Sequence, residues 1–264
     1  MSGPRLALWQ GAGVAGDLAA TLAEAARVAE EAGRAGADLL VFPEGFLTGY
    51  HLPGLAPEAL RGVEGALAEL RGVAKTAGVD VVMGTHLATP EGLANAAVVV
   101  DRAGVERGRY VKRAMFGAWE RATFVPGRSG LVVELGGLRV GVAICYDVEF
   151  PELIRADARA GADLVVVPTA LMEPHGAVAR LIPPARALEN QIFVAYANRV
   201  GAEAGLTYTG LSCICGPGGE MLAQAGVEPA LLIAELDRAR IAAARAEACY
   251  LDDLARLEAG PGRR

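Results

Sequence analysis

Serine is almost absent from this chain of 264 residues. Its three serines are Ser2, Ser129 and Ser212, and none of them lies in a Gly-x-Ser-x-Gly turn or in a stretch rich in glycine and serine. That turn is the sharp strand-to-helix connection that exposes the nucleophile of many serine hydrolases. The scarcity of serine therefore argues against a serine hydrolase.

Lysine is scarcer still, with Lys75 and Lys112 standing against 23 arginines. A lysine in such a chain indicates a specific role, because the ammonium is a compact point charge and the guanidinium is a planar fork, so the two are not interchangeable. Lys75 falls in a pattern typical of an amphipathic helix and is interpreted as a solvated side chain. Lys112 is the lysine for which we expect a function.

The chain also lacks basic runs and long apolar stretches. Its net charge is −6, so we expect neither nucleic acid nor an anionic membrane as a partner. The apolar run near the N-terminus is only four residues long, too short for a signal peptide, and no stretch approaches the length of a membrane span. We therefore expect a soluble, cytoplasmic protein.

The four cysteines do not form a disulfide framework, and their spacing contains no Cys-x-x-Cys pair. Cys213 and Cys215 alternate within Ser212-Cys-Ile-Cys-Gly216, so they are expected to face one side of a strand and to fill the core. A metal site is the less favoured alternative there, because no nearby His or second Cys pair completes a tetrahedral set. We expect no metal.

Repeated segments indicate an α/β fold. The segment Ala35-Gly-Ala-Asp-Leu-Leu-Val-Phe-Pro-Glu44 returns 125 residues later as Ala160-Gly-Ala-Asp-Leu-Val-Val-Val-Pro-Thr169, and more weakly as Ala77-Gly-Val-Asp-Val-Val-Met-Gly84. Each copy combines a helix-ending glycine with an apolar run typical of a strand buried on both faces. Ligands gather at the carboxyl ends of such strands, and Glu44, Thr169 and Cys145 all stand at such ends.

The segment Gly11-Ala-Gly-Val-Ala-Gly16 follows a first strand at 5–10 and matches the Gly-x-Gly-x-x-Gly pattern of dinucleotide sites. Asp17 occupies the helix start, where a pyrophosphate needs positive potential, and Glu44, the acid closing the next strand, comes 28 residues after Gly16. We therefore interpret the glycines as a turn, with Asp17 capping a helix that runs to about Ala32 and ends at Gly33.

No linker divides the chain, so we expect a single domain over residues 1–264. The long aromatic segment 110–127 is predicted to be irregular and functional. The remaining patterns predict helices at about 57–77 and 177–189, a strand at 191–198, a hairpin over 95–112 with its turn at 101–104, hairpins turning at 136–137 and 217–219, and an Arg/Ala-rich helix from Asp237 before an unstructured end.

Cys145 ends an apolar run and precedes a helix start in Val140-Gly-Val-Ala-Ile-Cys-Tyr-Asp-Val-Glu-Phe-Pro-Glu152. Pro151 suits the first turn of that helix. Peptide N–H groups and the positive end of a helix dipole favour a thiolate or a developing oxyanion, so the position suits a nucleophile. Free cysteine is also among the most buried residue types, and on this stretch alone a structural role is equally open.

A cysteine nucleophile needs a base, because the free thiol has a pKa of about 8.5 and is mostly protonated at neutral pH. Glu44 is the stronger candidate: it follows an apolar strand and Pro43, so burial should raise its pKa. A cap at the strand exit is the alternative role. The histidines His51, His86 and His175 lack a convincing acid partner, although His175 follows a strand end and could line a pocket.

Three segments, in this order, resemble the Glu, Lys and Cys motifs of the nitrilase superfamily of carbon–nitrogen hydrolases. They are Phe42-Pro-Glu-Gly-Phe-Leu-Thr-Gly-Tyr50, Tyr110-Val-Lys-Arg-Ala-Met-Phe-Gly117 and Ile144-Cys-Tyr-Asp-Val-Glu-Phe-Pro-Glu152. The likeness extends to Pro184-Ala-Arg-Ala-Leu-Glu-Asn-Gln191 and Tyr196-Ala-Asn-Arg-Val-Gly201, and so covers nearly the whole chain. Three ordered motifs are highly specific, whereas any one alone would be weak.

This resemblance implies a four-layer α-β-β-α sandwich with pseudo-repeated halves, commonly assembled as a homodimer or a higher homo-oligomer. The tail from about residue 238 is expected to contribute to oligomer contacts. The resemblance also implies Glu44 as general base, Lys112 as oxyanion stabiliser and Cys145 as nucleophile, with the backbone N–H of Tyr146 as a second oxyanion donor. No metal or organic cofactor is implied.

Members of the superfamily often carry a further glutamate four residues before a Phe-x-Pro-Gly sequence. Here that residue is Glu120, ahead of Phe124-Val-Pro-Gly127, and we expect it to orient the catalytic groups. One departure is visible: many relatives have His-Leu shortly after the lysine, where this chain has Ala114-Met115. That difference is expected to reshape the pocket wall.

The Cys-Tyr-Asp sequence at the nucleophile looks most like the aliphatic amidase group that includes 5-aminopentanamidase, whereas true nitrilases usually show Cys-Trp-Glu. The resemblance implies hydrolysis of a small aliphatic carboxamide, ω-amino carboxamides included, to a carboxylate and ammonia through a thioester. Alternatives left open are an N-carbamoyl amine or amino acid hydrolase, a nitrilase, and a catalytically silent binding protein on the same fold. The candidate pocket residues are Tyr50, Phe116, Trp119, Glu149, Ala170 and Met172.

Overall fold

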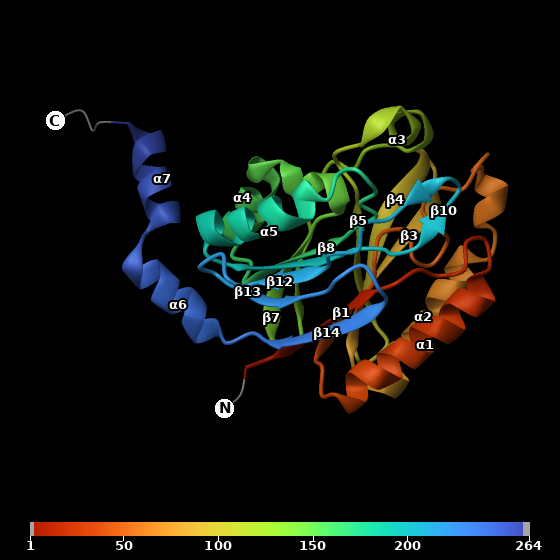
Figure 1. Cartoon of the computed structure of the whole chain (residues 1–264), viewed down its shortest axis with the longest axis horizontal. Helices are drawn as coiled ribbons and strands as arrows, with labels where there is room; N and C mark the ends of the chain where they lie inside the picture. The colour runs from red at the N-terminus through yellow and green to blue at the C-terminus, as the bar shows by residue number, and fades with distance from the viewer. Residues whose placement is uncertain (1–2, 261–264) are drawn as a thin grey trace.

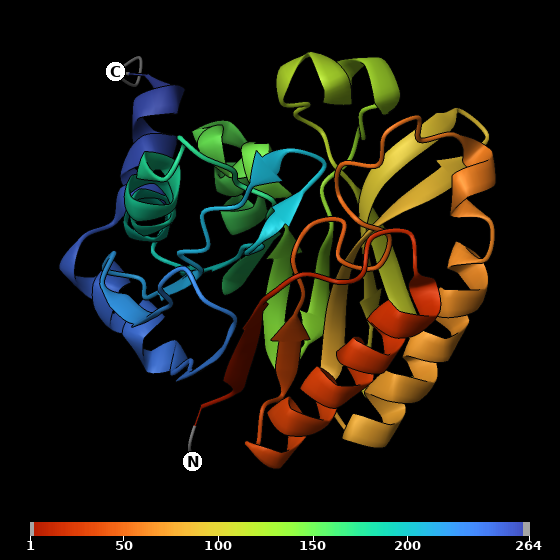
Figure 2. The same cartoon turned by 45° about the vertical axis from the view of Figure 1, so that its right-hand side comes forward.

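Two six-stranded β-sheets pack face to face, and helices cover the outer face of each sheet (Figures 1 and 2). The computed structural model describes residues 3–260. Helices α1 (Leu18–Arg34) and α2 (Val63–Ala77) cover the first sheet, and α4 (Pro151–Arg159) and α5 (Ala177–Asn190) cover the second. The order of layers is therefore helix, sheet, sheet, helix, and the predicted four-layer sandwich is confirmed.

The first sheet contains strands from the N-terminal half and one late strand. Its order is β14 (Ala230–Glu235), β1 (Arg5–Gln10), β2 (Leu39–Val41), β3 (Asp80–Thr89), β4 (Gly92–Val100) and β5 (Glu106–Val111). The second sheet has the order β13 (Met221–Gln224), β12 (Cys213–Cys215), β9 (Phe193–Ala197), β8 (Leu164–Pro168), β7 (Leu138–Val142) and β6 (Val132–Leu135). A small hairpin of β10 (Ala202–Glu203) and β11 (Leu206–Thr207) stands apart from both sheets.

The two sheets share one topology. In the first, β1, β2 and β3 run parallel, with antiparallel partners on both sides. In the second, β7, β8 and β9 run parallel and are flanked in the same way. The repeated segments 35–44 and 160–169 contain β2 and β8, the middle parallel strand of each sheet, so the predicted pseudo-repeat is confirmed.

Apolar residues fill three layers. One cluster lies between the sheets and includes Leu8, Val41, Val140 and Phe193, while two others join each sheet to its own helices. Strands covered on both faces must be apolar on both faces, which explains their continuous hydrophobic runs. Cys213 and Cys215 belong to the layer beneath α4 and α5, and the prediction that they fill the core is confirmed.

The structure corrects the predicted end of the first helix. Asp17 caps α1 as predicted, accepting a hydrogen bond from Ala20 N at 2.9 Å, but the helix runs to Arg34 and Gly33 lies inside it. The left-handed residue that follows is Gly36, with φ 75°. A Cβ at position 33 would lie 2.5 Å from the carbonyl oxygen of Ala77 on α2, so this glycine permits close helix packing instead.

Other boundaries also differ from the predictions. The predicted helix at 57–77 begins as a 3-10 turn, Pro57–Leu60, before α2, and the segment 110–127 contains a short helix, α3 (Gly117–Thr123). The predicted tail helix is two helices, α6 (Arg238–Glu247) and α7 (Tyr250–Ala259), and the last residues of the predicted unstructured end, 261–264, lie outside the described residues. None of the helices in residues 3–260 combines the length and apolar character needed to span a membrane.

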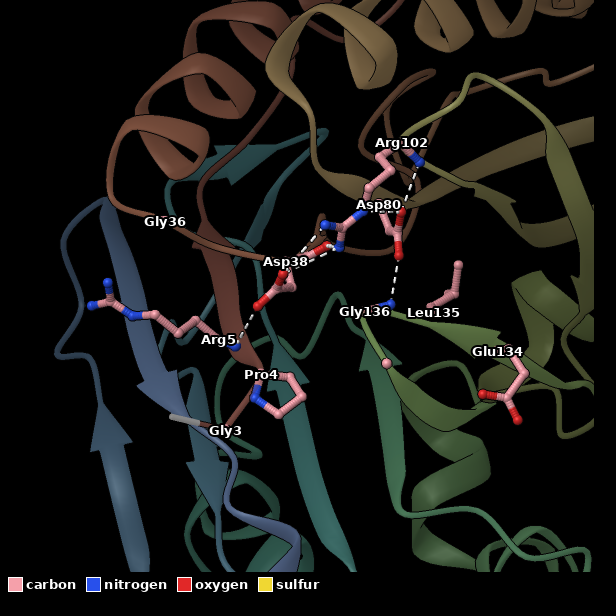
Figure 3. Close-up of a pocket in the computed structure, with 11 residues that line it drawn as sticks. Gly3, Pro4, Arg5, Gly36, Asp38, Asp80, Arg102, Glu134, Leu135 and Gly136 are labelled. Atoms are coloured by element: carbon pink, nitrogen blue, oxygen red, sulfur yellow. Dashed lines mark hydrogen bonds and ion pairs between the residues drawn. The ribbon is translucent and has the colours of Figure 1, made fainter. Parts of the chain in front are cut away.

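A hollow of about 580 Å³ lies at the amino ends of β1, β2 and β3 (Figure 3). The Asp80 carboxylate in it accepts hydrogen bonds from Arg102 N and Nε, at 2.7 and 3.1 Å, and from Gly136 N in the turn between β6 and β7. Arg102 also pairs with Asp38. Because these charges satisfy one another and join the two sheets, the hollow is interpreted as a structural link, at the edge opposite Glu44 and Cys145.

Candidate active site

Glu44 lies just beyond the carboxyl end of β2, and its carboxylate is fully buried. Lys112 follows β5 and donates through Nζ to Glu44 Oε1 at 2.8 Å and to Glu120 Oε1 at 2.6 Å. Asn95 on β4 donates to the same Glu44 oxygen at 2.7 Å. The second oxygen, Glu44 Oε2, accepts no hydrogen bond from the described residues and is free to take a proton.

Glu120 lies on α3, the short helix within the aromatic segment. The carboxylate is held from both sides, because Oε1 also accepts the Tyr50 hydroxyl at 2.8 Å and Oε2 accepts the Phe116 N–H at 2.6 Å. Trp119, on the same helix, packs edge-on against Tyr50 with their ring centroids 5.6 Å apart. Glu120 thus reaches Lys112 with its own position fixed.

The buried charges shift one another's pKa values. Burial, the largest effect, raises the pKa of Glu44; Lys112 opposes this rise and the Glu120 charge adds to it. Burial alone would lower the pKa of Lys112, but the charges of Glu44, Cys145 and Glu120 raise it above its ordinary value. The lysine therefore stays cationic, while the glutamate is brought closer to the range in which it can both accept and donate a proton.

Cys145 opens a 3-10 turn, Cys145–Glu149, just after β7. Its φ of 46° is in the left-handed region that side-chain-bearing residues seldom adopt, and such strain gathers at functional sites. Burial raises the pKa of the thiol well above its ordinary value, with the Glu44 charge adding to the effect and Lys112 opposing it. The resting thiol is therefore protonated, and it needs a base before it can attack.

The thiol faces a cavity of about 60 Å³. Of the residues predicted for the pocket, five lie in its wall together with Cys145 and Tyr146: Tyr50, Phe116, Glu149, Ala170 and Met172. Trp119 is outside the wall, behind Tyr50. Because Tyr50 both lines the cavity and donates to Glu120, it connects the cavity with the buried charge cluster.

The histidines occupy different environments. His175 lines the cavity, as its place after a strand end suggested, and its ring lies 5.6 Å from that of Phe116. His51 packs on Trp119, with ring centroids 4.3 Å apart. His86 is fully buried, and burial, with the nearby positive charges, lowers its pKa to about 3. That imidazole is therefore neutral at physiological pH.

Sequence reasoning missed Asn95, Leu171 and Val178. Leu171 and Val178 are apolar wall residues without any distinguishing sequence signal. Asn95 did have a signal, since it is the one amide in the otherwise apolar strand Gly-Leu-Ala-Asn-Ala-Ala-Val-Val-Val at 92–100. A buried amide costs free energy unless it is hydrogen-bonded, so its presence indicated a polar partner nearby.

An α-β-β-α sandwich that holds a Glu–Lys–Glu cluster beside a cysteine in a small cavity is the arrangement expected of a hydrolase that attacks carbon–nitrogen bonds with a thiol. The model of the family described as carbon-nitrogen hydrolase matches residues 5–246, and the chain belongs to that family.

Two amidases illustrate the relationship in sequence. An (R)-stereoselective amidase of a Pseudomonas species is 37% identical over 218 residues, which cover 82% of this chain and 79% of that protein. A 2-oxoglutaramate amidase of Bacillus subtilis is 31% identical over 220 residues, covering 83% of this chain and 85% of that protein. The similarity therefore extends over most of each chain.

A solved structure shows the same relationship in three dimensions. The amidase of Nesterenkonia sp. AN1, from the nitrilase superfamily, superposes with a TM-score of 0.87 at 37% identity, covering 97% of this chain and 96% of that chain. A structure of a mutant of that amidase shows the acetamide moiety of fluoroacetamide added covalently at the active-site cysteine. The present chain shares this fold. It is an amidase of the nitrilase superfamily, and its class of reaction is amide hydrolysis through a cysteine.

Proposed function

We propose that this amidase hydrolyses small aliphatic carboxamides, ω-amino carboxamides among them, and that Glu44, Lys112 and Cys145 carry the reaction. The observation on which the substrate proposal rests is the cavity of about 60 Å³ with the Cys145 thiol in its wall. A space of this size accepts an amide with a short side chain. Its aromatic and aliphatic walls suit a hydrocarbon chain between the amide and any distal polar group.

In this mechanism Glu44 takes the proton of the Cys145 thiol, and the sulfur attacks the amide carbon. The ammonium of Lys112 and the backbone N–H of Tyr146 stabilise the oxyanion of the tetrahedral intermediate. Glu44 returns the proton to the leaving nitrogen, so ammonia departs and a thioester remains. Glu44 then removes a proton from water, whose oxygen attacks the thioester, releasing the carboxylate and restoring the thiol. Glu120 orients Lys112 throughout.

Glu149 supports the extension to ω-amino substrates. Its carboxylate lines the cavity, is half-buried, and makes no hydrogen bond or ion pair with the described residues. Burial raises the pKa of Glu149, while the charge of His175 opposes that rise. A half-buried carboxylate without a partner is a favourable site for a substrate ammonium, because the ion pair forms away from bulk water.

Glu149→Gln is expected to lower kcat/KM for 3-aminopropanamide about tenfold or more, the scale of a lost hydrogen bond to a charged group. The value for butanamide, which has a methyl in place of the ammonium, should change less than about twofold. Ammonia release measures both. Glu152→Gln, which removes a carboxylate outside the cavity, is the matched control. Equal losses for the two substrates would remove the ω-amino proposal.

The same assay, extended to N-carbamoyl amines and nitriles, distinguishes the remaining candidates. A chain that releases ammonia from N-carbamoyl amines or nitriles but from none of the short carboxamides would contradict the proposed substrate class. Wild-type protein that is inert toward every compound would instead favour a silent binding protein.

We propose further that the chain forms a homodimer or a higher homo-oligomer through its tail helices. α7 contributes no buried residue, and its Tyr250 and Leu257 side chains are 45% and 78% exposed. Contact with a second copy would remove this apolar surface from water. Light scattering of the full chain should give at least twice the monomer mass, and Leu257→Glu should weaken the association. A monomeric wild type would overturn this proposal.

The cytoplasm is our proposed compartment. Cys213 and Cys215 fill the core, Cys145 lines the cavity and Cys249 is exposed, so the four cysteines are not arranged as a disulfide framework. Proteins of reducing compartments seldom carry such frameworks. Cell fractionation tests this assignment.

A further inference from the structure

Asp147 is a fully buried carboxylate two residues after Cys145. Asp147 and Ile144, on either side of the cysteine, are joined by two hydrogen bonds. Asp147 N donates to Ile144 O at 3.0 Å, and Ile144 N donates to Asp147 Oδ2 at 2.9 Å. This reciprocal pair closes a loop of backbone around Cys145, the residue with φ 46°. The carboxylate thus helps to hold the cysteine in its left-handed conformation.

The same carboxylate also binds the segment that carries Lys112. Oδ1 accepts the backbone N–H of Ala114 at 2.7 Å and that of Arg113 at 3.2 Å, and Oδ2 accepts the Tyr110 hydroxyl at 2.8 Å. These donors stand on both sides of Lys112 in the sequence. Asp147 therefore fixes the backbone from which the lysine side chain projects.

The two segments come from different sheets, since Lys112 follows β5 in the first and Cys145 follows β7 in the second. In residues 3–260, every hydrogen bond between the segments 110–114 and 143–149 ends on the Asp147 carboxylate. No β-ladder joins them. The relative position of lysine and cysteine therefore depends on this one side chain together with general packing.

We propose that Asp147 is a positioning residue that sets the position of Lys112 relative to Cys145. The inference rests on the proposed function, in which that lysine stabilises the oxyanion formed when the cysteine attacks. Four donors converge on Asp147, and an ionised carboxylate, with two oxygens that only accept, can satisfy all of them. An asparagine of the same shape offers one acceptor oxygen and turns an NH₂ group toward N–H donors.

Asp147→Asn is expected to lower kcat for butanamide about a hundredfold, the scale of a small misplacement of reacting groups. KM should stay within about threefold, because Asp147 is outside the cavity wall. Asp80→Asn is the matched control: Asp80 is also a buried acid on which several donors converge, but it lies in the hollow at the opposite edge of the sheets and contacts neither segment. Equal effects of the two variants on kcat, or a change confined to KM, would contradict a positioning role.

Tyr110→Phe provides a milder test should Asp147→Asn fail to fold. It removes one donor to the carboxylate, together with the oxygen that accepts Arg113 Nε, and keeps the ring. We expect kcat to fall about threefold to tenfold and the melting temperature to drop by about a few degrees. Where both variants fold, the double variant should lose less than the product of the two single effects, because both act on the same link. An unimpaired Tyr110→Phe, or fully multiplicative effects, would contradict the proposal.

Alkylation of Cys145 separates this inference from the proposed function. Iodoacetamide reacts with the thiolate, and peptide mass spectrometry follows the modification of this cysteine alone. Asp147→Asn should slow the alkylation about tenfold or more, because a displaced Lys112 no longer favours the thiolate. This readout applies even if the wild-type protein releases no ammonia from amides, in which case the proposed function fails alone. Unchanged alkylation in Asp147→Asn would overturn the positioning role.

Discussion

Cys145→Ala is expected to release ammonia from short amides at least about ten-thousandfold more slowly than the wild-type protein. Without the sulfur no thioester forms, and the neighbouring groups can only assist direct attack by water. The loss should therefore appear in kcat, with binding of the amide largely kept, because the alanine leaves the other cavity walls in place.

The control for this experiment is Cys249→Ala, which removes an exposed thiol at the start of α7. Cys249→Ala should keep full activity, and that result would show that the loss of a thiol elsewhere in the chain does not lower the rate of ammonia release. Mass spectrometry offers a second readout, since the wild-type protein should add the acyl group of a slow substrate and Cys145→Ala should not. Equal activity of Cys145→Ala and the wild type would remove Cys145 as the nucleophile.

Lys112→Arg is expected to lower kcat by about two orders of magnitude or more, the scale of losing an oxyanion donor. The Lys112 ammonium is wholly buried and is held between two carboxylates, at 2.8 Å from Glu44 and 2.6 Å from Glu120. A guanidinium is larger and planar, so it cannot occupy the same point without displacing one of these partners. The positive charge is kept, and only its shape and position change.

Lys75→Arg is the matched control for that substitution, because Lys75 is the other lysine of the chain and is exposed on α2. Its activity should be unchanged. Circular dichroism and the melting temperature should be recorded for both variants, since a poorly fitted group among buried charges can also destabilise the fold. An active Lys112→Arg would show that the position does not need an ammonium, and Lys112 would lose its proposed role.

Much of the fold was predictable because local patterns are strong here. Continuous apolar runs marked strands covered on both faces, and the copy 125 residues apart marked the internal repeat that the two sheets display. Predictions failed where tertiary contacts decide the local structure. The pattern predicts a helix end at Gly33, but α1 continues to Arg34. A glycine is needed inside the helix there because the Ala77 carbonyl of α2 leaves no room for a Cβ.

The candidate site was predictable to a similar extent. Ordered motifs indicated Glu44, Lys112 and Cys145, and the spacing to Phe-x-Pro-Gly indicated Glu120. Asn95 was missed, although a lone amide in an apolar strand was a signal. The hydrogen bonds of Asp147 to the lysine segment could not be predicted from the sequence, because their donors, Tyr110, Arg113 and Ala114, lie more than 30 residues away.

The sequence by itself thus determined the α/β class, the repeat and the residue types available for chemistry, because periodicity and motif order are local properties. The four layers followed from the resemblance that the ordered motifs carry. Only the tertiary structure decided which oxygen of Glu44 is free, how small the cavity is, and that a buried aspartate joins the lysine and cysteine segments. The first of these features depends on contacts between strands of one sheet, and the other two depend on contacts between the two sheets. Such contacts form only when both halves of the chain have folded against each other, bringing distant residues within hydrogen-bonding distance.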